Sequence, residues 1–519
     1  FFNWTQLLPA GNLLYHRPMN FLFGCKAAGC KSKSSTLYNL IFAALLILNA
    51  CISSAQTIEL PSLGDGSSRL ISPELEKQIG QMFLRSLNAN LPMNKDPLVQ
   101  NFVEEHARYL AQYSDLERML NTILVVDEKS LNAFAAPGGV AGVNLGLILN
   151  ARDISEYSWV IAHELAHLSQ RHFARGVEAS RANTIPILAS MIGAILVGAA
   201  GGSDAGLAAL SAGQAAAQAK QLRHSRAREI ESDRIGLNTM LRADLDLNAG
   251  VRMLERMQSA NRFRSAPPEF LLTHPLSETR ITDAKNQARA LQSTPAPETG
   301  STGNRFSQTY KLMRARVEKR FSNSPLAYVE NSERAIQVNP SDVRNRYAHV
   351  LSLSLIGKHN EAVTALDGLE DSIEDESVFY FTKAELLLEA EEPAKSIDVL
   401  ELAIQIHPDH FPILMIYAQT LNSLSRFEEA ERVMADLTRS RPNDTIVWFE
   451  LAETAGLAGN ISGVHLARAQ FFELMGAWHR SIQHLEYAQN LLGSEETIKA
   501  KKIDQQIFEL RKRIRTANS

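Results

Sequence analysis

The first half of the chain alternates between segments with a helical period and short apolar runs. Ser72-Pro73-Glu74 predicts a helix start, because serine caps a helix, proline fits its first turn and an acid there complements the helix dipole. A second helix is expected over 97–113. A third is expected over 155–171, where apolar residues surround the polar ones and favour a buried helix.

Apolar runs between these helices predict a small sheet. Residues 122–126 read Thr-Ile-Leu-Val-Val, which is typical of a strand. Residues 133–140 contain Pro-Gly-Gly and are expected to be a turn between apolar runs, and residues 143–149 are expected to form another strand. The first half is therefore predicted to be an α+β region with few strands.

The second half is repetitive and helical. Three prolines that follow helical stretches, and three alanines, recur at intervals of one or two tetratricopeptide periods of about 34 residues each. These are Pro340, Pro408 and Pro442, and Ala384, Ala418 and Ala452. Small residues suit close helix pairs and proline ends the second helix of a pair, which agrees with this kind of repeat. The register slips between Ala348 and Ala384, and Glu374 stands where a proline is expected.

These patterns divide the chain into four parts. A stretch rich in Pro, Ser, Thr and Gly over 292–304 is the clearest linker. We therefore expect a leader over 1–55, a catalytic domain over 56–291 and a domain of about four degenerate repeats over 305–519. An unspecific helical bundle is the alternative for the last part.

Composition narrows the class of partner. The chain has 519 residues, 45% hydrophobic and 21% charged, with a formal net charge of -4. These values are ordinary for a folded protein, and the absence of a broad positive charge disfavours nucleic acid as a partner.

The leader has the order of a secretory signal peptide. Met19 is a plausible start, lysines follow it, residues 40–48 are apolar, and Ser53-Ser54-Ala55 is a small-residue cleavage site. The alternative within this segment is a lipobox at Leu48-Asn49-Ala50-Cys51, which would make Cys51 a lipid anchor. All three cysteines lie in the leader, so disulfides are not expected in the exported protein.

Residues 182–203 carry no charge and are long enough to span a bilayer. One proline and several glycines interrupt the segment. We expect a helical pair packed on the catalytic domain, with peripheral membrane contact and a true span as alternatives.

The segment His163-Glu164-Leu165-Ala166-His167 carries the most specific chemistry. Two histidines four positions apart lie on one face of a helix, so both imidazoles can bind one ion. Glu164 stands between them and can contact a water on that ion, whose pKa zinc lowers to about 7. The pattern predicts a zinc site with a general base, and a pair of core histidines is the alternative.

A third ligand must come from elsewhere in the chain. Gln170 and Phe173 stand where metzincins place glycine and histidine, which excludes that class. On a helix around 228–233, Glu229 and Asp233 share a face and Glu231 points away from it. Glu229 is therefore the ligand candidate, while Asp233 can orient a zinc histidine or donate a proton.

Four motifs in this order resemble those of the HtpX-like and CAAX-protease-like zinc peptidases. They are Asn132-Ala133-Phe134-Ala135-Ala136-Pro137-Gly138-Gly139, the segment from His163 to His167, Glu229 with Asp233, and Thr273-His274-Pro275-Leu276-Ser277. With the leader and the repeats, the chain is similar to the periplasmic beta-barrel assembly-enhancing proteases of Gram-negative bacteria over about residues 60–515. The implied fold is mainly α, with a zincin-type peptidase domain of α+β type followed by a helical repeat solenoid.

The resemblance implies roles for single residues. One Zn²⁺ per chain would be bound by His163, His167 and Glu229, with Glu164 as general base and Asp233 in a catalytic or orienting role. His274 would approach the zinc, occupy its open position and hold the enzyme latent; a plain loop histidine is the alternative.

The same resemblance places other residues at the substrate. Asn132 and Phe134 would border the cleft, where a strand pairs with an extended substrate, although Phe134 equally fits a core position. Arg280 would pair with a site carboxylate or face solvent. Segment 182–203 is a further candidate, as a lid.

The expected function is that of a zinc endopeptidase for misassembled outer-membrane proteins, located in the periplasm. By the resemblance, its partners would be β-barrel precursors and their assembly machinery, with chaperone-like assistance of barrel assembly. The alternative is a chaperone or scaffold in which the repeats bind partners and the protease site is latent. A repeat groove and a catalytic site on one chain favour selection of substrates by docking.

Overall fold

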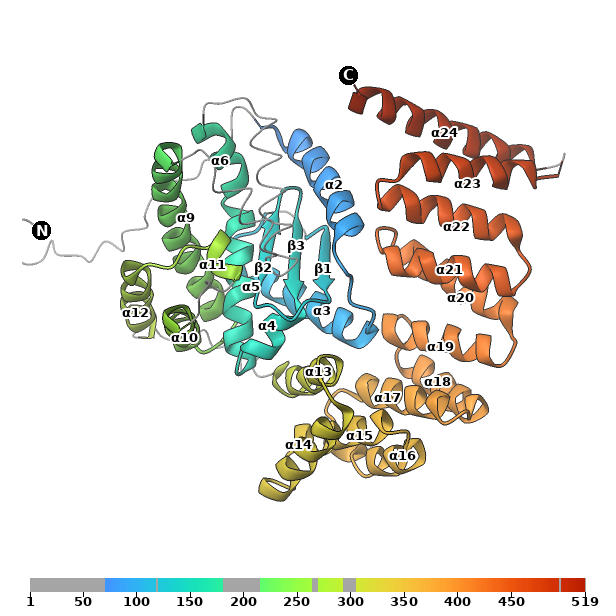
Figure 1. Cartoon of the computed structure of the whole chain (residues 1–519), viewed down its shortest axis with the longest axis horizontal. Helices are drawn as coiled ribbons and strands as arrows, with labels where there is room; N and C mark the ends of the chain where they lie inside the picture. The colour runs from blue at the N-terminus through green and yellow to red at the C-terminus, as the bar shows by residue number, and fades with distance from the viewer. Residues whose placement is uncertain are drawn as a thin grey trace, which may run out of the picture. The chain divides into compact units, whose positions relative to one another are not determined.

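The computed structural model describes residues 71–117, 120–180, 215–263, 269–292, 305–493 and 496–518 (Figure 1). The leader, segment 182–203 and residues 293–304 of the expected linker lie outside the described residues. By their contacts, all described residues belong to one unit, within Gly64–Ser519. No helix in the described part of the chain combines the length and apolarity that a bilayer span needs.

The first region consists of helices around a small sheet. Its helices are α2 (Pro73–Asn90), α3 (Pro97–Tyr113), α4 (Leu145–Asn150), α5 (Ile154–Ser169), α6 (His172–Ser180), α9 (Ala215–Arg242), α10 (Asn248–Phe263), α11 (Glu269–Thr273) and α12 (Glu278–Gln292). The predictions for α2 and α3 are confirmed, and Ser72 caps α2 by accepting a hydrogen bond from the Leu75 amide. The helix predicted over 155–171 is confirmed as α5, which ends slightly earlier, at Ser169.

Three strands form the sheet in the order β1-β3-β2. The strands are β1 (Thr122–Val126), β2 (Ala133–Ala136) and β3 (Val140–Asn144). Strand β1 runs parallel to β3, and β2 runs antiparallel to it. Both β1 and β2 are therefore edge strands of this sheet.

The sequence prediction was wrong over 133–149. The expected turn over 133–140 is confined to the residues around Gly138 and Gly139, whose φ angles of 75° and 76° permit a tight hairpin. The residues before this turn are paired as β2. The expected strand over 143–149 ends at Asn144, and helix α4 follows. The prediction failed because an apolar run that is buried on all sides has no periodicity that separates a helix from a strand.

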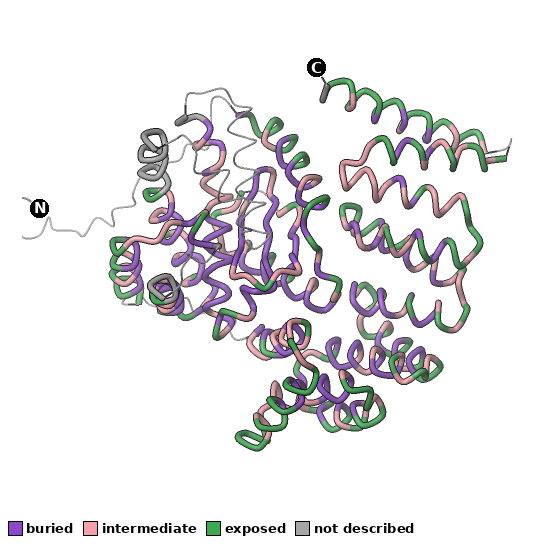
Figure 2. The backbone as a smooth tube through the Cα atoms, viewed as in Figure 1, coloured by how far each residue is buried: buried purple, intermediate pink, exposed green. Residues whose placement is uncertain are grey.

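Helix α5 lies at the centre of this region and is buried on almost every side. It packs against β2, α9 and α10, and its side chains Tyr157 and Trp159 are fully buried. Figure 2 shows that the centre of this region is coloured mostly as buried. A helix covered on all faces has a fixed position, so the side chains that it carries are held rigidly.

The second region is a series of helix pairs. These are α13 (Ser307–Arg320), α14 (Pro325–Val338), α15 (Val343–Leu355), α16 (His359–Asp367), α17 (Glu376–Glu389), α18 (Pro393–Ile406), α19 (Phe411–Ser423), α20 (Phe427–Ser440), α21 (Thr445–Leu457), α22 (Ile461–Leu474), α23 (Trp478–Asn490) and α24 (Thr497–Asn518). The second helices of five successive pairs begin at 325, 359, 393, 427 and 461, a constant interval that equals the tetratricopeptide period. Within residues 305–518, as far as described, there are six pairs, more than the four expected.

The repeat signals in the sequence have clear structural counterparts. Pro340, Pro408 and Pro442 each follow shortly after the end of a second helix. Ala384, Ala418 and Ala452 are buried in first helices. The slip in register falls where a short 3₁₀ turn, Glu370–Ser372, is inserted before α17.

A backbone motif also recurs with the repeat. Residues 357, 391, 425 and 459 all have positive φ, and they follow one another at the same interval as the helix starts. After each of them, a backbone amide bonds the carbonyl five positions earlier, as Arg426 does to Leu421 at 2.9 Å. This is the Schellman pattern, which ends a helix and turns the chain toward the next one.

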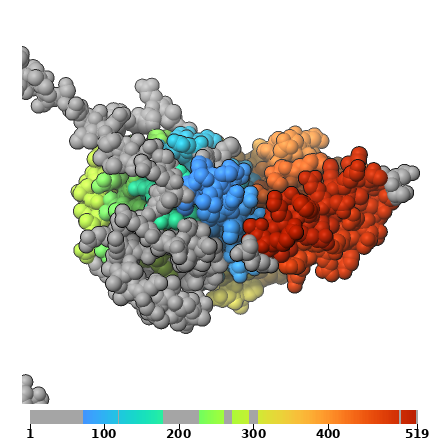
Figure 3. Space-filling model, turned by 90° about the horizontal axis from the view of Figure 1, so that it is seen from above, coloured from blue at the N-terminus to red at the C-terminus, as the bar shows by residue number. Residues whose placement is uncertain are grey.

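The two regions share an extensive contact. The Tyr310 hydroxyl on α13 donates to the carbonyls of Ile148 and Ala151 at 3.0 and 2.9 Å. Further along the repeats, Arg441 forms an ion pair with the buried Glu104 of α3. Helix α2 also contacts α22, and Figure 3 shows its surface beside that of the last repeats.

Candidate metal centre

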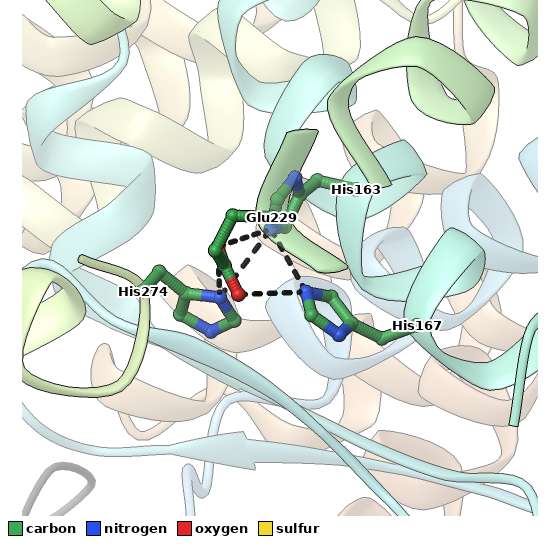
Figure 4. Close-up of side chains that lie close together, drawn as sticks. All are labelled: His163, His167, Glu229 and His274. Atoms are coloured by element: carbon green, nitrogen blue, oxygen red, sulfur yellow. Dashed lines mark hydrogen bonds and ion pairs between the residues drawn. The ribbon is translucent and has the colours of Figure 1, made fainter. Parts of the chain in front are cut away.

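Three separate segments bring four ligand side chains together. Helix α5 carries His163 and His167, α9 carries Glu229, and His274 directly follows α11 (Figure 4). One ligand atom from each residue lies within 4.8 Å of all the others. The pairing of Glu229 with the two histidines of α5 was expected from the spacing of polar residues, and the structure brings these residues together.

The distances fit one small cation. Nε2 of His163 lies 3.0 Å from Nε2 of His167 and 3.3 Å from both Oε2 of Glu229 and Nδ1 of His274. Tetrahedral zinc with bonds of about 2.0–2.1 Å separates its ligand atoms by about 3.3 Å. Two or three imidazoles and a carboxylate are also the donor types that zinc prefers.

The charges of the cluster fit a cation as well. Three carboxylates, those of Glu164, Glu229 and Asp233, meet one guanidinium, that of Arg280, so neutral imidazoles leave two negative charges uncompensated. Burial lowers the pKa of His163, but hydrogen bonds to Asp233 and Glu229 outweigh burial and raise it to about 9. Without a metal, a proton on this imidazole supplies part of the missing positive charge. A bound divalent ion would supply that charge in place of the proton.

Glu229 is held in its ionised form. Burial raises the pKa of its carboxyl, but His274 and His167, together with hydrogen bonds, outweigh this effect and keep the pKa well below its usual range. Its side chain is 3% exposed, and Arg280 Nη1 lies 3.1 Å from Oε2. A buried carboxylate is stable only with such partners or with a metal.

Asp233 lies behind the cluster. Its Oδ1 is 2.9 Å from Nδ1 of His163, and Arg280 donates from Nε to its Oδ2 at 2.5 Å and from Nη2 to its Oδ1 at 2.9 Å. Both oxygens are therefore occupied. Arg280, which the sequence left between an ion pair and solvent, is 1% exposed and paired with this carboxylate.

Glu164 is the unusual member of the site. It is 3% exposed, and neither of its carboxylate oxygens has a hydrogen-bond partner among the described residues. Nε2 of His274 lies 3.4 Å from Oε1 of Glu164. An orphaned carboxylate is costly in a protein interior unless water or a ligand completes it, and it points to a function.

The expected cleft residues lie near the sheet edge. Phe134 of β2 is 3% exposed and its ring packs on Gly142 of β3, so its side chain is in the core. Asn132 immediately precedes β2 and is 2% exposed, and its carbonyl accepts a hydrogen bond from the Asn144 amide. Strand β2 packs against α5, the helix that carries His163 and His167.

The sequence analysis missed a second hydrogen-bond chain. His172 at the start of α6 places Nδ1 3.0 Å from Nδ1 of His167, and its Nε2 lies 3.1 Å from Oε2 of Glu231. That contact is the main cause of a lowered pKa of Glu231, about 2. The only signal in the sequence was a histidine five positions after His167, a spacing that no single helix face explains.

Comparison with known families agrees with this geometry. Residues 94–288 match the model of peptidase family M48, and residues 387–452 match a tetratricopeptide repeat model. This part of the chain is therefore similar to peptidase family M48. The chain is a metallopeptidase of mainly helical fold, with tetratricopeptide-like repeats after the peptidase domain.

Named proteases of bacteria and mitochondria are similar to this chain. A protein of Vibrio cholerae serotype O1 whose name describes a beta-barrel assembly-enhancing protease is 29% identical over 85% of this chain and 90% of its own length. The mitochondrial metalloendopeptidase OMA1 of Bos taurus is 33% identical over 30% of this chain and 29% of its own. A solved tetratricopeptide repeat protein from Parabacteroides merdae covers 45% of this chain at 9% identity with a TM-score of 0.26, which is too distant to inform the fold.

Proposed function

We propose that this chain is a zinc-dependent endopeptidase of the periplasm that cleaves misassembled outer-membrane proteins. The observation that carries the proposal is the convergence of two histidines and Glu229 beside a buried Glu164 that lacks a hydrogen-bond partner among the described residues. A structural metal site needs no such carboxylate, whereas a hydrolytic site needs a base.

His163, His167 and Glu229 would hold the zinc ion. When bound there, zinc acts as a Lewis acid toward a peptide carbonyl and makes a water acidic enough to attack near neutral pH. Glu164 accepts the proton of the attacking water and passes it to the leaving amine. Its burial keeps competing water from this proton transfer.

Asp233 and Arg280 position the site. With both oxygens already occupied, Asp233 is suited to orient His163 through Nδ1 and not to donate a proton. Arg280 holds Asp233 and Glu229 together on α9 and compensates part of their charge. Such outer partners fix the tautomer and direction of a metal-binding imidazole.

Strand β2 is the proposed docking edge for substrate. It is an edge strand of the described sheet and packs on α5, so an extended peptide paired with it would run past Glu164. The side chain of Phe134 then supports the strand from the core, and its backbone contacts the substrate.

His274 is proposed to keep the enzyme latent. Its Nδ1 lies 3.1 Å from Glu229 Oε2, and its ring stacks on Phe270 with centroids 4.4 Å apart. A fourth protein ligand closes the position that a catalytic zinc keeps for water and substrate. Substrate binding would have to displace this histidine before hydrolysis.

The first test replaces the proposed base. Glu164→Gln should retain zinc at wild-type stoichiometry and lose about 10²–10⁴-fold in the rate of cleavage of an unfolded outer-membrane protein. Glu156→Gln is the matched control, since Glu156 is a buried glutamate on the same helix that pairs with Arg256. Cleavage by Glu164→Gln at the control rate would reject the mechanism.

The second test addresses latency. His274→Ala should cleave the same substrate faster than wild type while it still binds zinc. His359→Ala, a change at a half-buried histidine of the repeats, serves as control. Equal or lower activity of His274→Ala would contradict the latent state.

Substrate and compartment are inferred from relatives and repeats. The names of the similar bacterial proteases refer to barrel assembly, and helical repeats form surfaces that bind protein segments. A chaperone or scaffold whose repeats bind assembly partners is the second candidate. In a deletion strain, full restoration of barrel assembly by Glu164→Gln would favour that candidate, whereas failure to restore it would favour proteolysis.

A further inference from the structure

The two histidines of α5 have different partners on the side that faces away from the cluster. Each points Nε2 toward Glu229, at 3.3 Å for His163 and 3.5 Å for His167. Nδ1 of His163 contacts a carboxylate, Asp233. Nδ1 of His167 contacts another imidazole, that of His172, at 3.0 Å.

The position of His172 depends on a sharp reversal of the chain. Helix α5 ends at Ser169, and Arg171 adopts a φ of 48°, which is costly for a side chain other than glycine. Its guanidinium bonds Glu76 Oε2 at 2.8 Å and the Ile71 carbonyl at 2.9 Å. These bonds offset the strained backbone, and the turn brings His172 back to the metal cluster.

The positions of the hydrogen atoms in the series His167–His172–Glu231 follow from the metal site at one end and the Glu231 carboxylate at the other. If Nε2 of His167 binds a metal, its proton must be on Nδ1, which makes Nδ1 a donor toward His172. Nδ1 of His172 is then an acceptor, and its proton is on Nε2. That Nε2–H donates to Oε2 of Glu231. An ionised carboxylate accepts hydrogen bonds and cannot donate one.

The surroundings hold this order in place. Arg175 Nη1 donates to both oxygens of Glu231 at 3.2 Å. The Ser232 hydroxyl lies 3.3 Å from Nδ1 of His172, and Arg228 Nη1 donates to the His172 carbonyl at 3.0 Å. His172 itself is 3% exposed, so water does not compete for its ring nitrogens.

We propose that His172 is a positioning residue for the metal ligand His167, with Glu231 holding the imidazole of His172 in the accepting orientation. The inference rests on the metal ligands proposed above. It assigns a role to Glu231, which the sequence placed on the side of α9 that points away from Glu229 and Asp233. The metal centre thus has two anchors, one direct carboxylate behind His163 and one imidazole–carboxylate chain behind His167.

The experiment separates the two contacts of the His172 ring. His172→Phe keeps the bulk of the ring and removes both contacts. His172→Asn places an amide oxygen near the position of Nδ1 and can accept from His167, whereas His172→Gln reaches only the position of Nε2 and Glu231. Zinc affinity is measured by competition with a chelator, and Co²⁺ in place of zinc reports the ligand geometry through its visible absorption spectrum.

We expect His172→Phe to weaken zinc binding about 10–100-fold and to change the Co²⁺ spectrum. His172→Asn should restore most of the lost affinity, and His172→Gln should not. Glu231→Gln should give a smaller loss, because an amide oxygen still accepts from His172 without a charge. His479→Phe, a change at an exposed histidine of the repeats, should match wild type.

The outcomes decide between a positioning and a merely packing role. Wild-type zinc affinity and an unchanged Co²⁺ spectrum in His172→Phe would overturn the proposal, as would recovery in His172→Gln but not in His172→Asn. If the phenylalanine variant does not fold, the comparison of asparagine with glutamine still decides. His167→Ala tests the ligand assignment separately: if it binds zinc as wild type does, the proposed function fails, whereas loss in His167→Ala beside normal His172 variants rejects only this inference.

Discussion

The peptidase region and the repeat region place their important residues in opposite ways. The metal centre draws His163 and His167 from α5, Glu229 from α9 and His274 from beyond α11, and these contacts join residues up to 111 positions apart. In the repeats, most helices contact mainly the helices next to them along the chain, and the same turn geometry returns in successive repeats. One region is a site assembled from distant segments, and the other is a series of local units.

This difference determines how far a perturbation travels. A distant contact in the metal centre links charges on several elements, so removing one partner leaves the others buried and unpaired. Among the repeats themselves, a change within one repeat is felt mainly by that repeat and its neighbours, because the repeats of a solenoid pack on the repeats beside them. Four variants test this contrast.

The largest effect is expected at Arg280. Arg280→Met leaves Asp233 and Glu229 without their buried guanidinium, which should lower the free energy of unfolding of the chelator-treated protein by about 3–5 kcal/mol. Chemical unfolding followed by circular dichroism measures the change. The control is Arg289→Met, at an exposed arginine of the same helix α12. An equal effect in both variants would contradict a charge cluster that depends on Arg280.

The next effect is expected in the last repeats. Leu485 is 1% exposed in a hydrophobic cluster of α22 to α24, separate from the peptidase core. Leu485→Ala should destabilise this end by about 3 kcal/mol while zinc affinity stays at the wild-type value. Leu491→Ala, a change at an exposed leucine of the same pair, is the control. Weaker zinc binding in Leu485→Ala alone would show that the solenoid end is coupled to the site.

A smaller, pH-dependent effect is expected at His106 of α3. Burial lowers the pKa of this imidazole to about 3, so the unfolded chain binds a proton there that the folded chain does not. Stability is therefore lost as the pH falls below about 6.5, by about 2 kcal/mol at pH 5. His106→Phe should remove this part of the pH dependence, as measured by unfolding at about pH 7.5 and about pH 5, and His479→Phe should not. An unchanged slope in His106→Phe would exclude a neutral, buried His106.

The smallest effect is expected at a turn of the repeats. Ser425 has a φ of 59° at a position where Gly357 and Gly459 stand in other repeats. Ser425→Gly should raise the melting temperature slightly, corresponding to about 0.5–1 kcal/mol, because glycine adopts this conformation without strain. Ser423→Gly, slightly earlier and inside α19, should have the opposite sign. The same sign in both would contradict the periodic turn motif.

Helical periodicity was the basis for most of the expected site residues. The spacing of His163 and His167 and the shared face of Glu229 and Asp233 predicted that these side chains meet, and the structure brings them together. The same reasoning could not find His172, since the positive φ of Arg171 interrupts the helix just before it. It also failed over 133–149, where burial on all sides removed the alternation that separates strand from helix.

By itself, the sequence determined the mainly helical character of the chain, the tetratricopeptide period and the pair of histidines on one helix face, because these depend on spacing along one helix or one repeat. The tertiary structure decided the rest. It buries Arg280 against Asp233, leaves the carboxylate of Glu164 without a hydrogen-bond partner among the described residues, and brings His172 into contact with His167. These features depend on the packing of α5 against α9 and on the turn at Arg171. Interactions between segments far apart in the chain leave no periodic signal, so only the folded arrangement reveals them.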